Sequence, residues 1–324
     1  MSRVIVAGKY QLLKKIGAGS FGTIFKGVTP PRPPPGEGRT QEADATCSNY
    51  VNSIDQSNTA QANTASASCV RPSKDGGVRG AALHAPIAIK IMGSEHASLL
   101  QNEVAIYEKL REIKYIPSIY ASGTEGKFNY LVMDLLEQSV EELHKNYGDQ
   151  MSLKVVIHLA LQMLNITEQI HAYGIIHRDL KPANFLLKTN AQQISELYLI
   201  DFGLAKCFLD EKKRHCTIKT NEQIVGTTRY MSVNVHQGLT ASRRDDLESL
   251  GYSLLFLYHG QLPWQNQPSL ALVVDLKQKF DWTVNTIGEF VLFILYCRNL
   301  GFSDKPNYDY LRGILTNLNI HGCK

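Results

Sequence analysis

The sequence lacks the features of disulfide-rich, zinc-ribbon and membrane-spanning proteins. Its 324 residues include only six cysteines, and no two of them form a Cys-x-x-Cys pair. We therefore expect reduced thiols and a cytoplasmic location, with nuclear access left open. The longest apolar runs, Leu250–Tyr258 and Phe290–Cys297, are far shorter than the ~20 residues that cross a bilayer. We therefore expect no membrane span.

The chain also lacks a strong excess of charge of either sign. Lys and Arg number 34 against 30 Asp and Glu, a formal net charge of +4. So small an excess does not indicate nucleic acid as a partner. Hydrophobic residues make up 44% of the chain, which excludes disorder of the whole chain.

Residues 29–85 are poor in core-forming side chains. They contain one aromatic residue, Tyr50, and five large aliphatic ones, namely Val51, Ile54, Val70, Val78 and Leu83. Such a segment buries too little apolar surface to offset its ordering entropy, so we expect a disordered insertion. It opens with Pro-Pro-Arg-Pro-Pro-Pro, which could bind an SH3-type partner. A tolerated expansion of a loop is the alternative interpretation.

Hydrophobic periodicity predicts a small β-rich region followed by a larger helical one. Alternating patterns indicate strands at Tyr10–Ile16, Thr23–Val28, Pro86–Ile91, Tyr115–Tyr120, Asn129–Met133 and Leu197–Ile200. Helical spacing indicates helices at Ala97–Ile113, from Ser152 to Gly174, at Asp245–Tyr258 and at Thr286–Cys297. We therefore expect an α+β fold, with a small antiparallel sheet and one helix over residues 1–136 and a mainly helical part over residues 137–324.

Two features of the first part indicate nucleotide binding. Gly17–Gly22 matches Gly-x-Gly-x-x-Gly, and a strand follows it rather than the helix of a dinucleotide-binding unit. That order favours a hairpin whose turn covers nucleotide phosphates. In the first helix, Leu99, Ile106 and Leu110 share an apolar face with Glu103. A carboxylate there requires a cation, and Lys90 on the preceding strand is the candidate.

The strongest chemical pattern is His177-Arg-Asp-Leu-Lys-Pro-Ala-Asn184, followed by Asp201-Phe-Gly203. Phosphoryl transfer needs a carboxylate to accept the hydroxyl proton, a cation for the γ-phosphate and oxygen ligands for Mg²⁺. We assign Asp179 as the base, Lys181 to the γ-phosphate, and Asn184 and Asp201 to the metal.

In these motifs the chain resembles the eukaryotic protein kinases, over Tyr10–Val28 and from Pro86 to about Asn319. A lysine two residues after the base, here Lys181, is similar to the pattern of serine/threonine kinases. Ser232-Val-Asn234 and Ser242–Gly251 are similar to signatures of the casein kinase 1 family. The resemblance implies a two-lobed kinase domain that uses ATP and Mg²⁺ and acts on Ser or Thr in acidic or pre-phosphorylated proteins.

The resemblance also implies roles for particular residues. Asp246 would brace the catalytic loop, and Thr227 would bond near Asp179 and Lys181. The nucleotide would be bound by Lys90, by Ile16, Gly17, Gly19, Ser20 and Gly22 of the glycine turn, and by Ile24, Ala88, Met133, Asp134, Leu136, Leu186 and Ile200 around the adenine.

A basic pocket for acidic substrates would include Lys219 and Arg229, with Gly260 nearby. The family's lysine after Leu262-Pro-Trp-Gln265 is absent, and Pro268 stands about there. We expect a monomer acting on protein substrates. A pseudokinase or scaffold that binds partners through this fold and the proline-rich insertion is the alternative.

Overall fold

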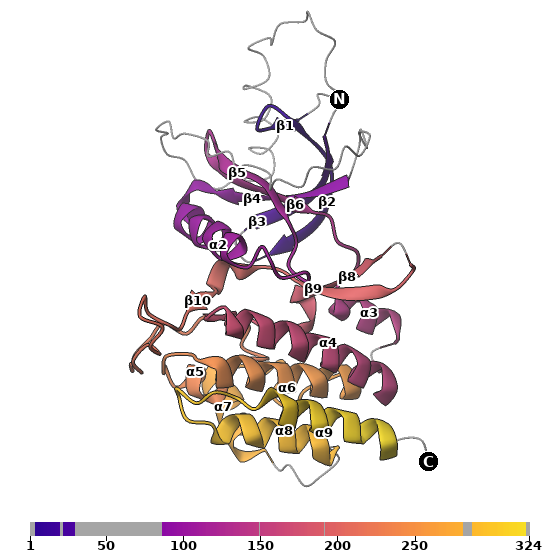
Figure 1. Ribbon diagram of the computed structural model, residues 1–324, viewed down its shortest axis with the longest axis vertical. Coiled ribbons are helices and arrows are strands. Elements are labelled where there is room, and N and C mark those ends of the chain that lie inside the picture. The colour runs from indigo at the N-terminus through magenta and orange to yellow at the C-terminus, as the bar shows by residue number, and fades with distance from the viewer. Residues whose placement is uncertain are drawn as a thin grey trace, which may run out of the picture. The chain divides into compact units, whose positions relative to one another are not determined.

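The protein is described by a computed structural model covering residues 4–19, 22–29, 86–148, 150–190, 192–280 and 287–321. Most of the insertion, Ser20 of the glycine turn and the proposed SH3 ligand therefore lie outside the described residues. The chain divides into two compact units. The first holds the described residues up to Glu108 together with Pro117–Leu136, and the second holds Lys109–Ile116 and everything from Glu137 onward. The predicted α+β class is confirmed (Figure 1).

The first unit is built on an antiparallel sheet of six described strands in the order β1-β2-β3-β4-β6-β5. Their bounds are β1 Ile5–Val6, β2 Tyr10–Gly19, β3 Gly22–Val28, β4 Pro86–Gly93, β5 Ile119–Glu125 and β6 Phe128–Asp134. Strands β2 and β3 form the predicted hairpin, with Gly19 opposite Gly22. A Cβ at Gly22 would lie 2.4 Å from the Ile91 carbonyl oxygen, so only glycine fits this close approach of two strands.

Alternation along these strands places apolar side chains in one core. Val6, Leu12, Phe25, Ile89 and Val132 are among its buried members. A 3₁₀ turn, η1 Ser94–His96, leads into helix α2, Ala97–Lys109. Hydrophobic burial thus fixes the strand that carries Lys90 and the helix that carries Glu103.

Three local predictions in this part of the chain were wrong in detail. Helix α2 ends at Lys109 instead of Ile113, because the Ile113 amide bonds the carbonyl of Leu110 in a tighter turn. Leu100 lies on the buried face while Leu99 is half-buried. The strand expected at Tyr115–Tyr120 begins only at Ile119, since Pro117 has no amide hydrogen for a ladder.

The second unit is mainly helical (Figure 1). Its helices are α3 Val140–Asn146, α4 Leu153–Ala172, α5 Val233–His236, α6 Arg243–His259, α7 Leu270–Lys279, α8 Gly288–Asn299 and α9 Tyr308–His321. Short elements between α4 and α5 carry the motifs around Asp179 and Asp201. Strand β7 Ile175–Ile176 pairs with β10 Lys206–Cys207, and β8 Phe185–Thr189 pairs with β9 Ser195–Leu199. The elements η2 Pro182–Asn184 and η3 Phe202–Leu204 are 3₁₀ turns. No helix in the described part of the chain is both long and apolar enough to span a membrane.

Helix α6 is the central helix of this unit. It contacts α4 and α8, and α9 packs against both of those helices (Figure 1). Every residue from Asp245 to Leu257 is buried. At its start the Ser242 amide donates to the Asp245 carboxylate at 2.8 Å, as an acidic residue in the first turn of a helix commonly allows. Three buried carboxylates, Asp245, Asp246 and Glu248, therefore enter the interior from one helix.

Candidate active site

In the first unit, Lys90 of β4 and Glu103 of α2 form a buried ion pair. The Lys90 ammonium lies 3.1 and 2.8 Å from the two carboxylate oxygens of Glu103, and Glu103 is only 1% exposed. A carboxylate so buried is stable as an anion only beside a cation. The pairing predicted from the helix pattern is therefore present, and it holds the lysine in one orientation.

The candidate adenine-binding residues of this unit lie on neighbouring strands. Ala88 pairs directly with Met133 across β4 and β6, and Ile24 of β3 pairs with Lys90. Ile16 is exposed and Leu136 half-buried. The carboxylate of Asp134, at the end of β6, accepts hydrogen bonds from the Ser118 amide and the Tyr120 hydroxyl. The Asp134 side chain therefore links the end of β6 to the start of β5.

In the second unit, the structure brings Asp179, Lys181 and Thr227 together. The Asp179 carboxylate accepts from the Lys181 ammonium at 2.6 Å and from the Thr227 amide at 2.7 Å. Lys181 also donates to the Thr227 hydroxyl at 2.8 Å. A carboxylate held by two donors in one orientation can accept a proton from a substrate hydroxyl. Lys181 places a positive charge beside it.

A glycine permits the approach of Thr227 to this cluster. Gly226 has φ of 108°, a backbone conformation that other residues rarely adopt. A Cβ there would lie 2.6 Å from the carbonyl oxygen of Arg178. Any side chain at this position would push Thr227 away from Asp179.

Asn184 and Asp201 offer oxygen atoms suited to a hard cation. The Asn184 side-chain nitrogen donates to the Asp179 carbonyl at 2.9 Å, which leaves the amide oxygen as its ligating atom. Asp201 has a left-handed backbone, with φ of 68°. In the described part of the chain, no group of three or more His, Cys, Asp or Glu side chains could hold a metal by itself. These two residues fit Mg²⁺ that takes its other ligands from phosphate oxygens and water.

Asp246 of α6 holds the backbone of the loop that carries Asp179. Its carboxylate accepts from the backbone amides of His177 and Arg178, at 2.7 and 2.9 Å. Burial raises the pKa of Asp246, but the hydrogen bond and charge of His171 and the bond from His177 outweigh burial, so the pKa is lowered. The carboxylate therefore stays ionised and keeps the loop backbone in place.

His171 is a residue that sequence reasoning missed. It is buried in α4, with Nε2 at 3.0 Å from Asp246 and Nδ1 at 2.7 Å from the Tyr308 hydroxyl of α9. Its place inside the helix predicted from Ser152 to Gly174 was the only indication in the sequence that His171 is buried. It connects the catalytic loop to the last helix.

Leu186 and Ile200, the remaining candidate adenine residues, flank the metal-binding motifs. Leu186 lies on β8 opposite Tyr198. The Ile200 amide donates to the Asn184 carbonyl, and its own carbonyl accepts from His177 Nε2, both at 3.0 Å. Both side chains are half-buried.

Arg229 lines an open cavity of about 690 Å³ that Lys181 and Thr227 also line. The guanidinium lies 5.5 Å from the centre of the Phe256 ring. The lining also includes Gln265, Asn266, Gln267 and Pro268, all neutral, where the kinase resemblance implies a lysine. Among the lining residues the charged ones are Lys181, Arg229 and Glu141.

The structure does not bring all three predicted pocket residues to this cavity. Lys219 lines a separate one, of about 540 Å³, with Lys206 and Arg214. Gly260 ends helix α6, with φ of 80°. Neither Lys219 nor Gly260 is among the residues that line the cavity of Arg229. Sequence spacing alone could not separate the two cavities, because Lys219 and Arg229 lie in one irregular segment.

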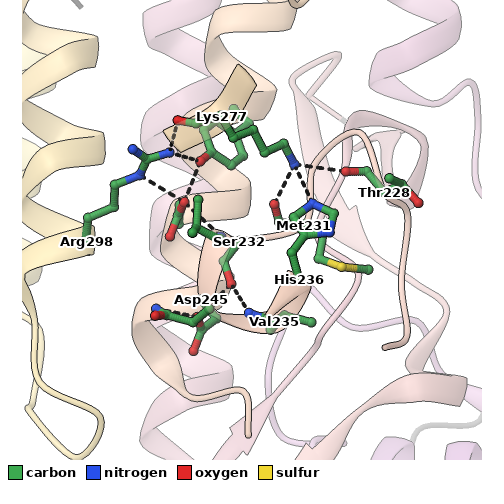
Figure 2. Close-up of polar contacts among 12 residues, drawn as sticks. Thr228, Met231, Ser232, Val235, His236, Asp245, Lys277 and Arg298 are labelled. Atoms are coloured by element: carbon green, nitrogen blue, oxygen red, sulfur yellow. Dashed lines mark hydrogen bonds and ion pairs between the residues drawn. The ribbon is translucent and has the colours of Figure 1, made fainter. Parts of the chain in front are cut away.

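The segment that carries Arg229 is anchored by buried polar side chains. Ser232 donates to Asp245 at 2.7 Å, and the Val233 amide donates to Glu248 at 3.2 Å. Trp264 Nε1 donates to the Arg229 carbonyl at 2.8 Å. Lys277 of α7 lies 3.1 Å from Nε2 of His236, a pair shown in Figure 2.

This pair makes stability depend on pH. Burial, and next the nearby charge of Lys277, lower the pKa of His236 to about 4. Because the ordinary value is 6.5, the unfolded chain binds more protons between those two pH values, so stability falls as the pH drops from about 6.5 to 4. The full loss is of the order of 3 kcal/mol. His236→Gln should remove this loss in urea unfolding, while His158→Gln at an exposed site should keep it.

Two comparisons with known proteins show the family of the chain. A model of the protein kinase domain matches residues 78–289, more than half of the chain. Casein kinase I homolog RAG8 of Kluyveromyces lactis is 33% identical over 323 residues, covering 96% of this chain. The match covers 51% of that relative, so the chain spans about half the length of the curated protein.

The matched domain includes Lys90, Glu103, Asp179, Asn184 and Asp201, and it implies the use of ATP, generally with Mg²⁺. The likeness to a casein kinase I homolog points to the same family. The chain belongs to the protein kinase family and is similar to a casein kinase I homolog.

Proposed function

We propose that this kinase transfers the γ-phosphoryl group of Mg-ATP to Ser and Thr hydroxyls in acidic or already phosphorylated protein segments. The observation that carries the proposal is the single cavity shared by Lys181, Thr227 and Arg229. It combines the transfer chemistry with a guanidinium that can pair with a substrate phosphate or carboxylate.

The residues of the second unit support in-line transfer. Asp179 would orient the attacking hydroxyl and accept its proton, since both its oxygens are already fixed by donors. Lys181 would stabilise negative charge on the transferred group. Asn184 and Asp201 would hold Mg²⁺, which when bound neutralises charge on the phosphates. Lys90, fixed by Glu103, would contact the α- and β-phosphates.

The cavity supports acidic substrates through one guanidinium rather than a cluster. Arg229 and Lys181 are the cations that line it, and the lining residues from Gln265 to Pro268 are neutral. A guanidinium bonds a phosphate through two parallel N–H donors. We therefore propose that a phosphate or carboxylate in the substrate binds at Arg229, with Lys219 playing no part.

Substitution of Arg229 tests the acidic preference. Arg229→Gln should lower kcat/KM for a pre-phosphorylated acidic peptide by about 10–100-fold, because one charge-assisted interaction is lost. It should change kcat/KM for a neutral peptide much less. Steady-state kinetics on paired peptides that differ only in the priming phosphate measure both effects.

Lys219→Gln is the matched control, since it removes a cation from the same segment but from another cavity. It should leave the primed and neutral peptides as in the wild type. An equal loss on both peptides in Arg229→Gln would show that Arg229 only supports the segment. A loss for Lys219→Gln as large as that for Arg229→Gln would mean that substrates reach both cavities.

A further inference from the structure

Lys277 of helix α7 is a buried lysine that the phosphoryl-transfer chemistry leaves unused. Its side chain is 0% exposed. The ammonium donates to the carbonyls of Thr228 and Met231, at 2.9 and 2.6 Å, and to His236 Nε2 at 3.1 Å. Figure 2 shows the nitrogen in the middle of these three acceptors. An ammonium has three N–H donors, so each one has a partner.

Both carbonyls belong to the segment that carries Arg229. Thr228 and Met231 flank Arg229, and the Arg229 carbonyl is itself held by Trp264. One nitrogen that bonds residues three apart fixes the curvature of the chain between them. Thr228 is also the direct neighbour of Thr227, which contacts Asp179 and Lys181. The conformation of the segment on both sides of Arg229 therefore depends on Lys277.

Lys277 is itself held in place by residues of the neighbouring helices. Arg298 of α8 donates to the Lys277 carbonyl at 3.0 Å and to Glu248 at 3.1 Å. Glu248 also accepts from the Val233 amide. Figure 2 shows Arg298 next to Lys277. The faces of the Tyr252 and Trp264 rings lie 4.9 and 5.5 Å from the Lys277 ammonium, a cation–π arrangement. Side chains from helices α6, α7 and α8 thus form one network that holds the segment with Arg229.

Burying an ammonium is costly in free energy, and here the charge is compensated mainly by carbonyl dipoles and ring faces. The titratable groups that face it are His236 of α5, Glu248 and Tyr252 of α6 and Arg298 of α8. A neutral side chain of similar size would fill the volume but would donate to neither the Thr228 nor the Met231 carbonyl. Lys277 is therefore more than a space-filling residue.

We propose that Lys277 is a positioning residue for peptide substrates. Its ammonium holds residues 228–231 so that Arg229 lines the substrate cavity and Thr227 stays on the catalytic pair. This role rests on the proposed peptide-binding function of that cavity, but not on a preference for acidic sequences.

The role predicts a dependence on pH as well as on substitution. Burial lowers the pKa of Lys277 to about 7. A neutral amine has only two donors for three acceptors. The KM for peptide should therefore rise as the pH increases from 6.5 to 8.5, and the KM for ATP should not follow it.

Lys277→Met tests the proposal at constant volume. We expect the KM for peptide to rise about tenfold at pH 6.5, since charge-assisted bonds are lost. The KM for ATP should stay within about twofold, and the variation of peptide KM with pH should disappear. Lys277→Arg, which keeps a cation with several donors, should recover part of the affinity. Lys279→Met, an exposed lysine on the same helix that pairs with Asp275, is the matched control and should behave as the wild type.

Other outcomes overturn the proposal. A wild-type peptide KM in Lys277→Met would show that the segment keeps its conformation without the ammonium. Equal changes in the KM for ATP and for peptide, with no change of pH profile, would indicate a purely structural role. If Lys277→Met does not fold, the pH profile of the wild type decides, and a flat peptide KM contradicts the role. Equal use of primed and neutral peptides by the wild type would instead overturn the acidic preference and leave the positioning role intact.

Discussion

Replacement of Asp179 by asparagine is expected to lower kcat by about 10²–10⁴-fold, the usual contribution of a positioned acid or base. The carboxylate lies at 2.6 Å from Lys181 and 2.7 Å from the Thr227 amide. An amide keeps the volume but cannot accept the hydroxyl proton, and its NH₂ group would face the Lys181 ammonium. The loss should appear in single-turnover transfer of labelled phosphate, while ATP binding changes little.

A second carboxylate provides the control for that measurement. Asp275 is partly exposed and pairs only with Lys279 among the contacts described here, so Asp275→Asn should keep full turnover. Asp179→Asn with wild-type turnover would remove Asp179 from the chemistry. Equal losses in both variants would indicate that the assay reports general damage to the protein.

Lys90→Met is expected to have the second large effect, because it acts on both activity and stability. Removal of the ammonium takes the positive charge of Lys90 away from Glu103, a carboxylate that is 1% exposed. Breaking one side of a buried ion pair costs about 3–5 kcal/mol. Turnover should fall to a small residual level as well, since the cation for the nucleotide phosphates is lost. Urea unfolding and phosphate transfer measure the two effects separately.

A double variant separates the two effects of Lys90. Lys90→Met with Glu103→Leu removes both charges together, and an apolar pair of similar volume often restores the stability. We therefore expect stability close to that of the wild type, with turnover still lost. Recovery of turnover along with stability would mean that Lys90 serves only to balance Glu103. Lys26→Met, at an exposed position of β3, should change neither quantity.

The proximity of the candidate catalytic residues could be predicted from the sequence, because they lie close together along the chain. Asp179, Lys181 and Asn184 occupy one six-residue stretch, so their proximity follows from the chain itself. The pairing of Lys90 with Glu103 was also predictable, since a helical period places Glu103 on an otherwise apolar face. Both cases depend on local spacing or on a clear exception to a hydrophobic pattern.

The buried residues that hold the loop of Asp179 and the segment of Arg229 were harder to predict from the sequence. Asp246 could be assigned only through the family resemblance. His171 and Lys277 bond groups that lie 75 and 41–49 residues away along the chain. Lys277 follows buried Val273 by one helical turn, but a lysine at that spacing is normally solvated. Their roles depend on how several helices pack, which periodicity does not encode.

Two predictions differ from the structure for a similar reason. They are the strand expected at Tyr115–Tyr120 and the joint pocket of Lys219 and Arg229. Each lies in an irregular segment, where one proline or one bend decides the outcome. In the first case, Pro117 delays the strand to Ile119. In the second, Lys219 and Arg229 line two cavities. Alternation and motif spacing say little about such segments.

The most direct test of the account is transfer of labelled γ-phosphate from Mg-ATP by the wild-type chain. Three peptides should be offered: an acidic one with a priming phosphate and a target Ser, the same peptide without the phosphate, and the primed peptide with Tyr in place of the target Ser. The account predicts label on the target Ser, most in the primed peptide, and little on Tyr. A protein whose melting temperature rises with Mg-ATP but which transfers no label to any peptide would contradict it, and would favour a binding scaffold with this fold.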